Sequence, residues 1–154
     1  MSIFLGLGSN LGNLQENLQK ALDMITDDHG IRILQKSSCY LTESAGMAEK
    51  SFFLNQVISV SSKYRPYKLL KKIESIEEIM GRTQKGIMKS RIIDIDIIAY
   101  NDEIISEQIL QIPHARMNER LFVLIPLKEI EPEWIHSKTK KHIDELITHV
   151  RAGY

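Results

Sequence analysis

The sequence has little of what marks secreted, membrane-bound or nucleic-acid-binding proteins. Its single cysteine, Cys39, cannot form an internal disulfide, and nothing suggests a secreted scaffold. The 20 basic and 20 acidic residues cancel, so no general affinity for nucleic acid or membrane surfaces is expected. No apolar run approaches the roughly 18 residues of a membrane span, and the N-terminus shows no signal peptide. These absences favour a cytoplasmic protein.

What the sequence does contain is typical of one globular domain. Hydrophobic residues make up 43% of the chain and charged residues 26%, which is ordinary for a protein with a buried core. A length of 154 residues suits a single domain, and no repeat, linker or low-complexity segment divides it. We therefore expect one domain over residues 1–154.

The segment 91–98 has the clearest chemical pattern. Its β-branched residues and its lack of glycine and proline predict a strand. Because side chains on a strand alternate between faces, Asp94 and Asp96 lie on one face, roughly 6.5–7 Å apart at Cα. Two unpaired carboxylates on so apolar a strand are unfavourable, and Mg²⁺, which prefers oxygen ligands, would relieve their repulsion. An isolated pair of this kind also fits a solvated acidic face.

Cationic residues flank this strand. Residues 82–90 carry three cations around a glycine without periodicity, which indicates a basic loop leading into Arg91 and the aspartates. The loop is therefore a candidate for phosphate binding, although most basic loops are only solvated. Further on, a short helix from about position 116 would place Arg116 and Arg120 on one side, close after His114.

Two other segments offer ligand contacts. On a predicted strand over 52–60, Phe53 and Asn55 share a face and supply a ring to stack on and an amide that donates and accepts. A packed phenylalanine beside a surface asparagine explains this pair as well. Gly8 and Gly12 would let a ligand approach the backbone closely, although turn geometry accounts for them equally.

The order of elements predicts an α+β fold. Periodicity and turn signals give strand, helix, two strands, helix and strand, over 2–8, 13–30, 31–41, 52–60, 66–80 and 91–98. On the second helix, a solvated acidic face is the default interpretation of Glu74, Glu77 and Glu78. The order is that of a ferredoxin-like α/β sandwich, an antiparallel sheet with helices packed on it, with C-terminal additions that include a helix over 139–150.

These residues match the motifs of a known family over nearly the whole chain. The sequence resembles the 6-hydroxymethyl-7,8-dihydropterin pyrophosphokinase family of folate biosynthesis. The matching segments are Leu5–Gly12, Tyr40–Gly46, Phe53–Asn55, Glu77–Arg82, Arg91–Ile97 and Ile112–Leu127. Each is weak alone, and their order and spacing together make the match specific. The resemblance implies transfer of the β,γ-pyrophosphoryl unit of ATP to the pterin hydroxymethyl group, which leaves AMP.

The resemblance also implies roles for particular residues. Two Mg²⁺ ions on the ATP triphosphate would be held by Asp94 and Asp96. The phosphates would be faced by Arg82, Arg91, His114 and Arg120, and the nucleotide would lie near Glu77. The implied catalytic residues are Arg82, Arg91, Asp96 and Arg120. The pterin would lie between Phe53 and Phe122, and its edge would be read by Thr42, Ala45 and Asn55. A monomer that binds only these small molecules is expected.

The basic loop departs from the family pattern. An arginine expected two residues after Arg82 is Gln84, Trp-Gly-Pro expected before Arg91 is Met88–Ser90, and a proline expected in the preceding loop is Ser44. Lysines in the loop lack the bidentate fork of arginine. We therefore predict an active enzyme with altered kinetics of loop closure.

Three other functions are open. A non-catalytic pterin- or nucleotide-binding homologue is motivated by the altered loop. A ferredoxin-like RNA-binding module would need exposed sheet aromatics on a basic surface, whereas aromatics are 6% of the chain and the net charge is zero. Another Mg-dependent nucleotidyl- or glycosyltransferase built on the two aspartates would release pyrophosphate or a nucleoside diphosphate instead of AMP.

Overall fold

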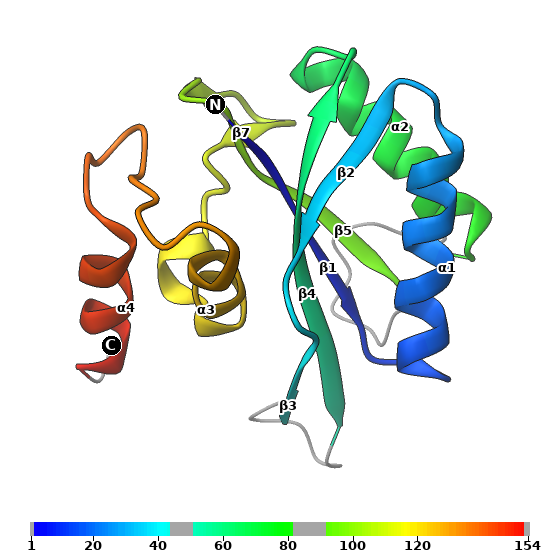
Figure 1. Ribbon diagram of the computed structural model, residues 1–154, viewed down its shortest axis with the longest axis horizontal. Coiled ribbons are helices and arrows are strands. Elements are labelled where there is room, and N and C mark those ends of the chain that lie inside the picture. Colours follow the sequence, from blue (N-terminus) through cyan, green and yellow to red (C-terminus); the bar gives the residue numbers. More distant parts are fainter. Residues whose placement is uncertain (1, 44–50, 82–91, 153–154) are drawn as a thin grey trace.

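The computed structural model describes residues 2–43, 51–81 and 92–152. Its centre is an antiparallel sheet in the order β2-β4-β1-β5, with β3 also paired to β4. The strands are β1 (Ile3–Ser9), β2 (Ile31–Lys36), β3 (Tyr40–Glu43), β4 (Phe52–Ser62) and β5 (Asp94–Tyr100). Helices cover both faces (Figure 1): α1 (Leu14–Asp27) and α2 (Pro66–Ile79) on one, α3 (Leu121–Ile130) and α4 (Ile143–Arg151) on the other.

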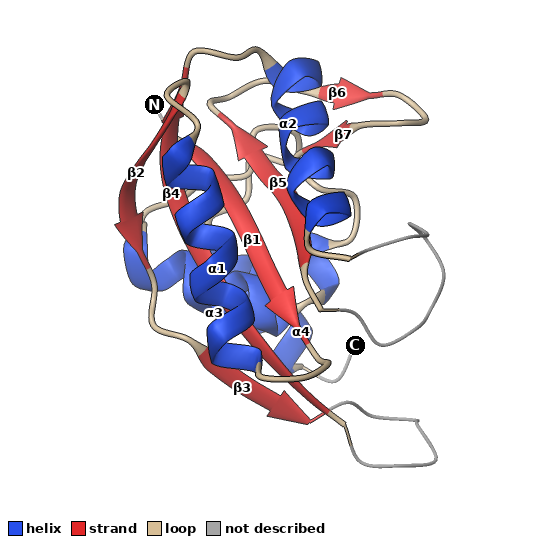
Figure 2. Ribbon diagram, turned by 90° about the vertical axis from the view of Figure 1, so that its right-hand side faces the viewer, coloured by secondary structure: helices blue, strands red, loops and turns tan. Residues whose placement is uncertain are grey.

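Apolar stripes on α1 and α2 form the first core, and Figure 2 looks onto this face with both helices lying across the strands. α1 begins after the N-cap Asn13, whose Oδ1 accepts a hydrogen bond from Glu16 N at 3.1 Å. Pro66 lies in the first turn of α2, where backbone N–H groups have no partner within the helix, so proline costs no hydrogen bond there. This core includes Leu5, Leu18, Ile25, Ile58, Leu69, Ile73 and Ile95.

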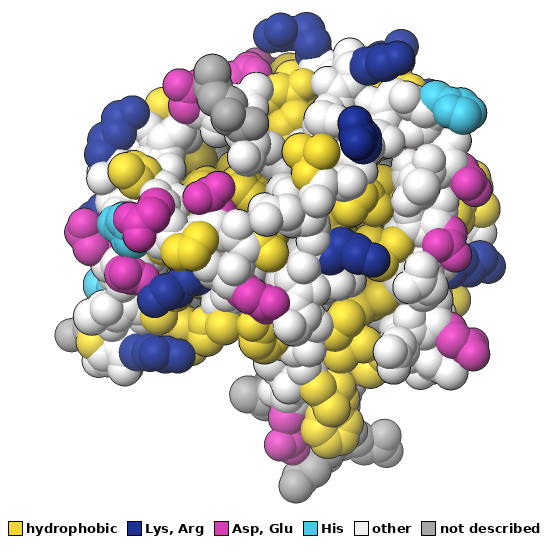
Figure 3. Space-filling view, in the orientation of Figure 1, with side chains coloured by type: hydrophobic (Ala, Val, Ile, Leu, Met, Phe, Trp, Pro, Cys, Tyr) yellow, Lys and Arg dark blue, Asp and Glu magenta, His cyan; other side chains and the backbone are white. Residues whose placement is uncertain are grey.

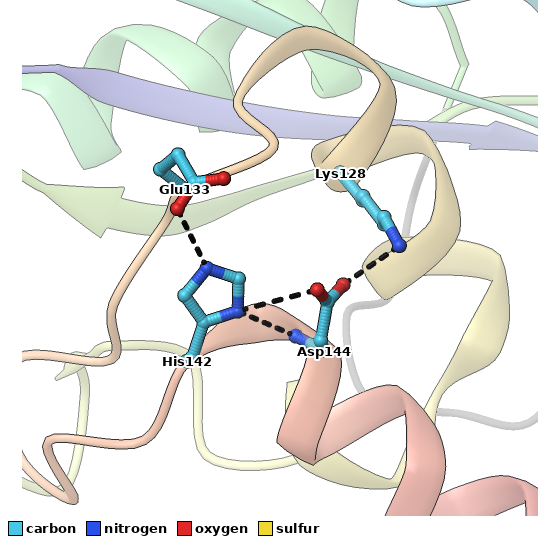
Figure 4. Close-up of polar contacts among 4 residues, drawn as sticks. All are labelled: Lys128, Glu133, His142 and Asp144. Carbon is cyan, nitrogen blue, oxygen red and sulfur yellow. Dashed lines mark hydrogen bonds and ion pairs between the residues drawn. The ribbon is translucent and has the colours of Figure 1, made fainter.

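α3 and α4 form a second core on the opposite face. α3 packs on β4 and α4 packs on α3, and the core includes Phe4, Val57, Ile98, Leu124, Leu127, Leu146 and Ile147. His142 is the N-cap of α4, since its Nδ1 accepts a hydrogen bond from Asp144 N at 3.0 Å. Figure 4 shows that Asp144 also pairs with Lys128 of α3, at 2.7 Å. These contacts join the two helices at the molecular surface.

A small hairpin follows the aspartate strand. β6 (Ile105–Ser106) pairs with β7 (Gln111–Ile112), and a cis Ile112–Pro113 peptide bond then leads to His114. Within the described ranges, no helix combines the length and apolar character that crossing a membrane requires.

The predicted order of elements up to β5 is confirmed except in the segment 31–41, which forms two strands, β2 and β3, where one was predicted. The C-terminal part also differs. Where a short helix from about 116 was predicted, a 3-10 turn (Met117–Glu119) precedes the ten-residue α3. The last helix begins at Ile143 and not at 139, because the preceding residues form a turn closed by a bridge between Ile135 and His142.

One prediction about α2 is wrong. The sequence pattern favoured a solvated acidic face for its three glutamates, but Glu77 is only 2% exposed, whereas Glu78 is exposed. The reason is rotational: Glu77 lies on the same side of the helix as Ile73 and Ile76, which are buried against the sheet.

Candidate active site

Two aspartates and an asparagine lie close together on the face of the sheet that α3 covers. Gly8 of β1 is paired with Asp94 of β5 on one side and with Asn55 of β4 on the other. Asp96 is paired with Gly6, one row further along the same strand. Because directly paired residues point to the same face, all three polar side chains share the face of the second core. The predicted common face of the two aspartates is confirmed.

Gly8 makes room for the side chain of Asn55 in the centre of this row. A Cβ atom on Gly8 would lie 2.9 Å from Oδ1 of Asn55, closer than side chains tolerate. Gly8 lies within the extended strand, whereas Gly12 has a φ of 79° and belongs to a turn. The two glycines therefore differ: Gly12 serves a turn, and Gly8 lets the Asn55 side chain lie close to the backbone of β1.

The second aspartate lies near a histidine. Nε2 of His114 is 3.8 Å from Oδ1 of Asp96, and the two side chains are 27% and 29% exposed. Nδ1 of His114 accepts a hydrogen bond from Arg116 N at 3.3 Å, so the proton of the neutral ring is on Nε2, toward the aspartate. His114 N donates to Ile98 O at 2.8 Å, which fixes this segment along β5.

Arg120 and Phe122 lie at the start of α3. Arg120 is the N-cap residue, and its guanidinium carbon is 5.6 Å from the centre of the Phe122 ring, within range of a cation–π contact. The Phe122 ring is 38% exposed. An aromatic face and a cation therefore stand together on the α3 side of the sheet.

A second aromatic side chain comes from the paired ends of β3 and β4. Phe53 is paired with Thr42, and Nδ2 of Asn55 is 3.5 Å from Oγ1 of Thr42. Figures 1 and 3 show these strand ends extending beyond the body of the molecule, where Leu41 and Phe52 are also exposed. A ring, an amide and a hydroxyl are thus grouped beside the Gly8 row.

Glu129 ties α3 to these strands. Its carboxylate accepts hydrogen bonds from Ser38 N at 3.0 Å, Ser38 Oγ at 2.9 Å and the Tyr40 hydroxyl at 2.5 Å. Tyr40 is in turn paired with Asn55. The Tyr40 hydrogen bond lowers the pKa of Glu129 and raises the pKa of Tyr40. The C-terminal end of α3 is therefore tied to the strands beside the asparagine.

Glu77 lies behind the aspartate strand and was expected near the nucleotide. Its Oε2 accepts a hydrogen bond from Ile95 N at 2.9 Å, and Ile95 is the residue between the two aspartates. The contact of Glu77 with a nucleotide stays a prediction.

Part of the predicted site falls outside the described residues. These are Arg82 and Arg91, expected at the phosphates, Ala45, expected at the pterin, and the altered loop positions Ser44, Gln84 and Met88–Ser90. Arg116, which was expected beside Arg120, is exposed and pairs with Glu119 at 3.7 Å.

Asp94 and Asp96 suit Mg²⁺ in ligand type and in number. Among the residues that the structure describes, no group of three or more His, Cys, Asp and Glu side chains could hold a metal ion. Mg²⁺ does not need such a group, because it commonly binds one or two carboxylates, keeps several waters and takes further oxygens from a phosphate ligand. Two carboxylates on one strand face fit an ion whose coordination a phosphate completes.

Sequence reasoning missed two features of this site. The link from Glu129 to Ser38 and Tyr40 joins residues about 90 positions apart, and no local pattern signals it. The close packing over β1 did have a signal: Gly6 and Gly8 alternate along the strand, so the side chains of Ile98 and Asn55 can lie close to its backbone.

Known proteins resemble the chain in sequence. A family model for 7,8-dihydro-6-hydroxymethylpterin-pyrophosphokinase (HPPK) matches residues 4–132. The chain is 36% identical over 132 residues to the 2-amino-4-hydroxy-6-hydroxymethyldihydropteridine pyrophosphokinase of Methylorubrum extorquens, a match that covers 86% of this chain and 84% of that protein. It is 35% identical over 144 residues to the protein of the same name from Aquifex aeolicus, covering 94% and 89%.

Longer proteins also match. Folic acid synthesis protein fol1 of Schizosaccharomyces pombe is 37% identical over 144 residues, which is 94% of this chain but 20% of that protein. The crystal structure of Plasmodium falciparum HPPK-DHPS with pteroate has a TM-score of 0.75 and 18% identity, covering 96% of this chain and 42% of that one. This likeness is one of fold, and the predicted ferredoxin-like α+β fold is confirmed.

Proposed function

The chain belongs to the 7,8-dihydro-6-hydroxymethylpterin-pyrophosphokinase family, and we propose that it transfers pyrophosphate from ATP to 6-hydroxymethyl-7,8-dihydropterin over the row Asn55–Gly8–Asp94. This row carries the proposal, because it has an amide at one end and a carboxylate at the other, both on one face of the sheet. The two ends are two strands apart, about 10 Å at Cα. That distance would separate a pterin at the amide from phosphates at the carboxylate.

At the amide end, the pterin would bind by its faces and by its edge. Phe53 and Phe122 would stack on the ring, which suits a planar heterocycle. Asn55 would donate to and accept from the ring edge beside Thr42, because an amide offers both donors and acceptors. Ala45 is assigned to the pterin site by the family resemblance alone.

At the carboxylate end, Asp94 and Asp96 would hold two Mg²⁺ ions together with the triphosphate of ATP. Bound Mg²⁺ would neutralise charge on the phosphoryl oxygens. Arg120 and the Nε2–H of His114 would face the phosphates, where fixed cations and donors stabilise developing charge. Arg82 and Arg91 are assigned to the same role by the resemblance.

The reaction then needs little covalent chemistry from the protein. The pterin hydroxyl oxygen bonds to the β-phosphorus, the bond from that phosphorus to the α,β-bridging oxygen breaks, and AMP leaves. The hydroxyl proton passes to a carboxylate, for which Asp96 is the candidate, or to water. Alignment of the two substrates and neutralisation of charge supply most of the catalysis in transfers of this type.

The test is AMP formation from ATP and Mg²⁺, with and without the pterin, in the native protein, Asp96→Ala and Asn55→Ala. We expect pterin-dependent AMP in the native protein, almost none in Asp96→Ala at saturating pterin, and a raised KM for pterin in Asn55→Ala. Asp102→Ala, in the turn after β5, is a matched control and should be as active as the native protein. Binding of both substrates without AMP would instead identify a non-catalytic homologue.

We further propose that residues 1–154 act as one domain, as a monomer in the cytoplasm. The match of 84–89% of the length of two relatives supports the single domain, and the use of ATP fits the cytoplasm. A molar mass near 17.7 kDa in light scattering is the expected result, and twice that value would contradict it.

A further inference from the structure

The aspartate strand is at the edge of the sheet. Among the residues that the structure describes, β5 pairs with β1 on one side only, so backbone groups on its outer edge need other partners. Two contacts cover that edge: Ile95 N donates to Oε2 of Glu77 at 2.9 Å, and Ile98 O accepts from His114 N at 2.8 Å. Asp96 lies between these two points.

The pairing of β5 with β1 explains how both contacts reach the same edge. Leu5 is opposite Ile97 and Phe4 is opposite Ala99, so β5 has one extra residue, Ile98, at a bulge. In a regular strand, residues 95 and 98 would direct their backbone groups to opposite edges. The bulge turns Ile98 outward to His114, and Ile95 remains outward toward α2.

The burial of the Glu77 carboxylate calls for a physical explanation. At 2% exposure Glu77 is almost fully removed from water, which is unfavourable for a carboxylate unless it receives hydrogen bonds. Its Oε2 accepts a hydrogen bond from Ile95 N, a backbone donor whose position is set by the strand. The bond therefore acts on the path of the backbone between Asp94 and Asp96.

We infer that Glu77 is a positioning residue for the cation site: it accepts the hydrogen bond of Ile95 N at the outer edge of β5, and it thereby fixes the backbone from which Asp94 and Asp96 project. This inference rests on the proposed function, since it concerns the ions that those carboxylates would bind. It differs from the direct nucleotide contact that the family resemblance implies. Glu77 acts through the strand, so an acceptor oxygen at this position is what matters.

Three variants separate the two roles. Glu77→Met has a similar volume and no acceptor, Glu77→Gln keeps an oxygen that can accept from Ile95 N, and Glu78→Met is the matched control on the exposed side of the same helix. The measurements are amide hydrogen exchange at Ile95 by NMR and the affinity for Mn²⁺, a substitute for Mg²⁺, in the presence of α,β-methylene-ATP. Neither depends on turnover.

In Glu77→Met we expect exchange at Ile95 to be about tenfold faster or more, and Mn²⁺ affinity to fall about 10–100-fold, as when partners that orient metal ligands are removed. Glu77→Gln and Glu78→Met should resemble the native protein in both. Native Mn²⁺ affinity in folded Glu77→Met would overturn the inference. A Glu77→Gln variant with native exchange at Ile95 but weakened Mn²⁺ binding would also overturn it, because the charge of Glu77 would then act directly on the cation.

If Glu77→Met fails to fold, Glu77→Gln decides by the same two measurements: native values in both support the inference, and any other result contradicts it. Failure of the proposed function is distinguishable, because the native protein would then bind no Mn²⁺ with the nucleotide analogue and form no AMP.

Discussion

Adding one methyl group to the row of the candidate site tests its geometry. In Gly8→Ala the new Cβ would lie 2.9 Å from Oδ1 of Asn55, a side chain that is only 7% exposed and has little room to move. Gly8 is in extended backbone, so alanine there introduces no strain in φ. The substitution should therefore displace the amide and leave the strand in place.

The size of the effect follows from the hydrogen bonds that Asn55 would lose. Two neutral bonds to the pterin edge contribute about 1–3 kcal/mol together, which corresponds to a rise of about 5- to 150-fold in KM for pterin. Overpacking costs about 1–3 kcal/mol, offset by about 0.4–1 kcal/mol from the stiffer unfolded chain. We expect a modest fall in the free energy of unfolding.

The assay is steady-state AMP formation with pterin varied at saturating ATP, with urea unfolding in parallel. Asn55→Ala and the double variant complete the cycle: once the amide is removed, alanine at position 8 should change the KM for pterin little further. Gly8→Ala with a native KM for pterin would refute the geometry. So would full additivity in the double variant, because the methyl group would then act independently of the amide.

Three further predictions concern the framework around the site. Because the pKa of Glu129 is lowered in the fold, its charge stabilises the protein above the unfolded pKa of about 4.3 and less as the pH falls through the folded value. Glu129→Gln should therefore have a lower melting temperature than the native protein at pH 7, and the difference should narrow below pH 4; a difference that stays constant with pH would contradict this. Tyr64 packs against Gly30, and Gly30→Ala would bring a Cβ into collision with the Tyr64 ring. The substitution should lower the free energy of unfolding in urea by about 1–3 kcal/mol; an unchanged midpoint would be inconsistent with this contact. His142→Ala removes the N-cap of α4 and should lower stability by about 1 kcal/mol, which His142→Asn should restore because asparagine is a good cap; equal losses in both variants would exclude the capping role.

Local rules were sufficient where one strand or one helix decides the outcome. The alternation of residues 93–97 predicts that Asp94 and Asp96 share a face, and the pairing with β1 confirms it. The stripe Leu14, Leu18, Leu22 and Ile25 likewise predicts one face of α1, and all four except the half-buried Leu14 are buried. These predictions need only the period of one element.

Features that depend on contacts between distant segments of the chain could not be predicted from the sequence. The row Asn55–Gly8–Asp94 follows from the register of three strands, and register is set by contacts across the sheet. α3 was missed because it is apolar on more than one side and contains Pro126, and it lies between the sheet and α4. The burial of Glu77 depends on how α2 packs on β5, which the helix sequence alone does not determine.

The proposed reaction moves the terminal two phosphates of ATP, as one unit, to the pterin hydroxymethyl group. ³¹P NMR of the purified pterin product formed with ATP and Mg²⁺ tests this transfer. We expect two coupled phosphorus signals on the pterin, one AMP per product and no product from Asp96→Ala, as pyrophosphate transfer requires. A single phosphorus signal with ADP as co-product, or ATP returned unchanged by well-folded native protein, would contradict it.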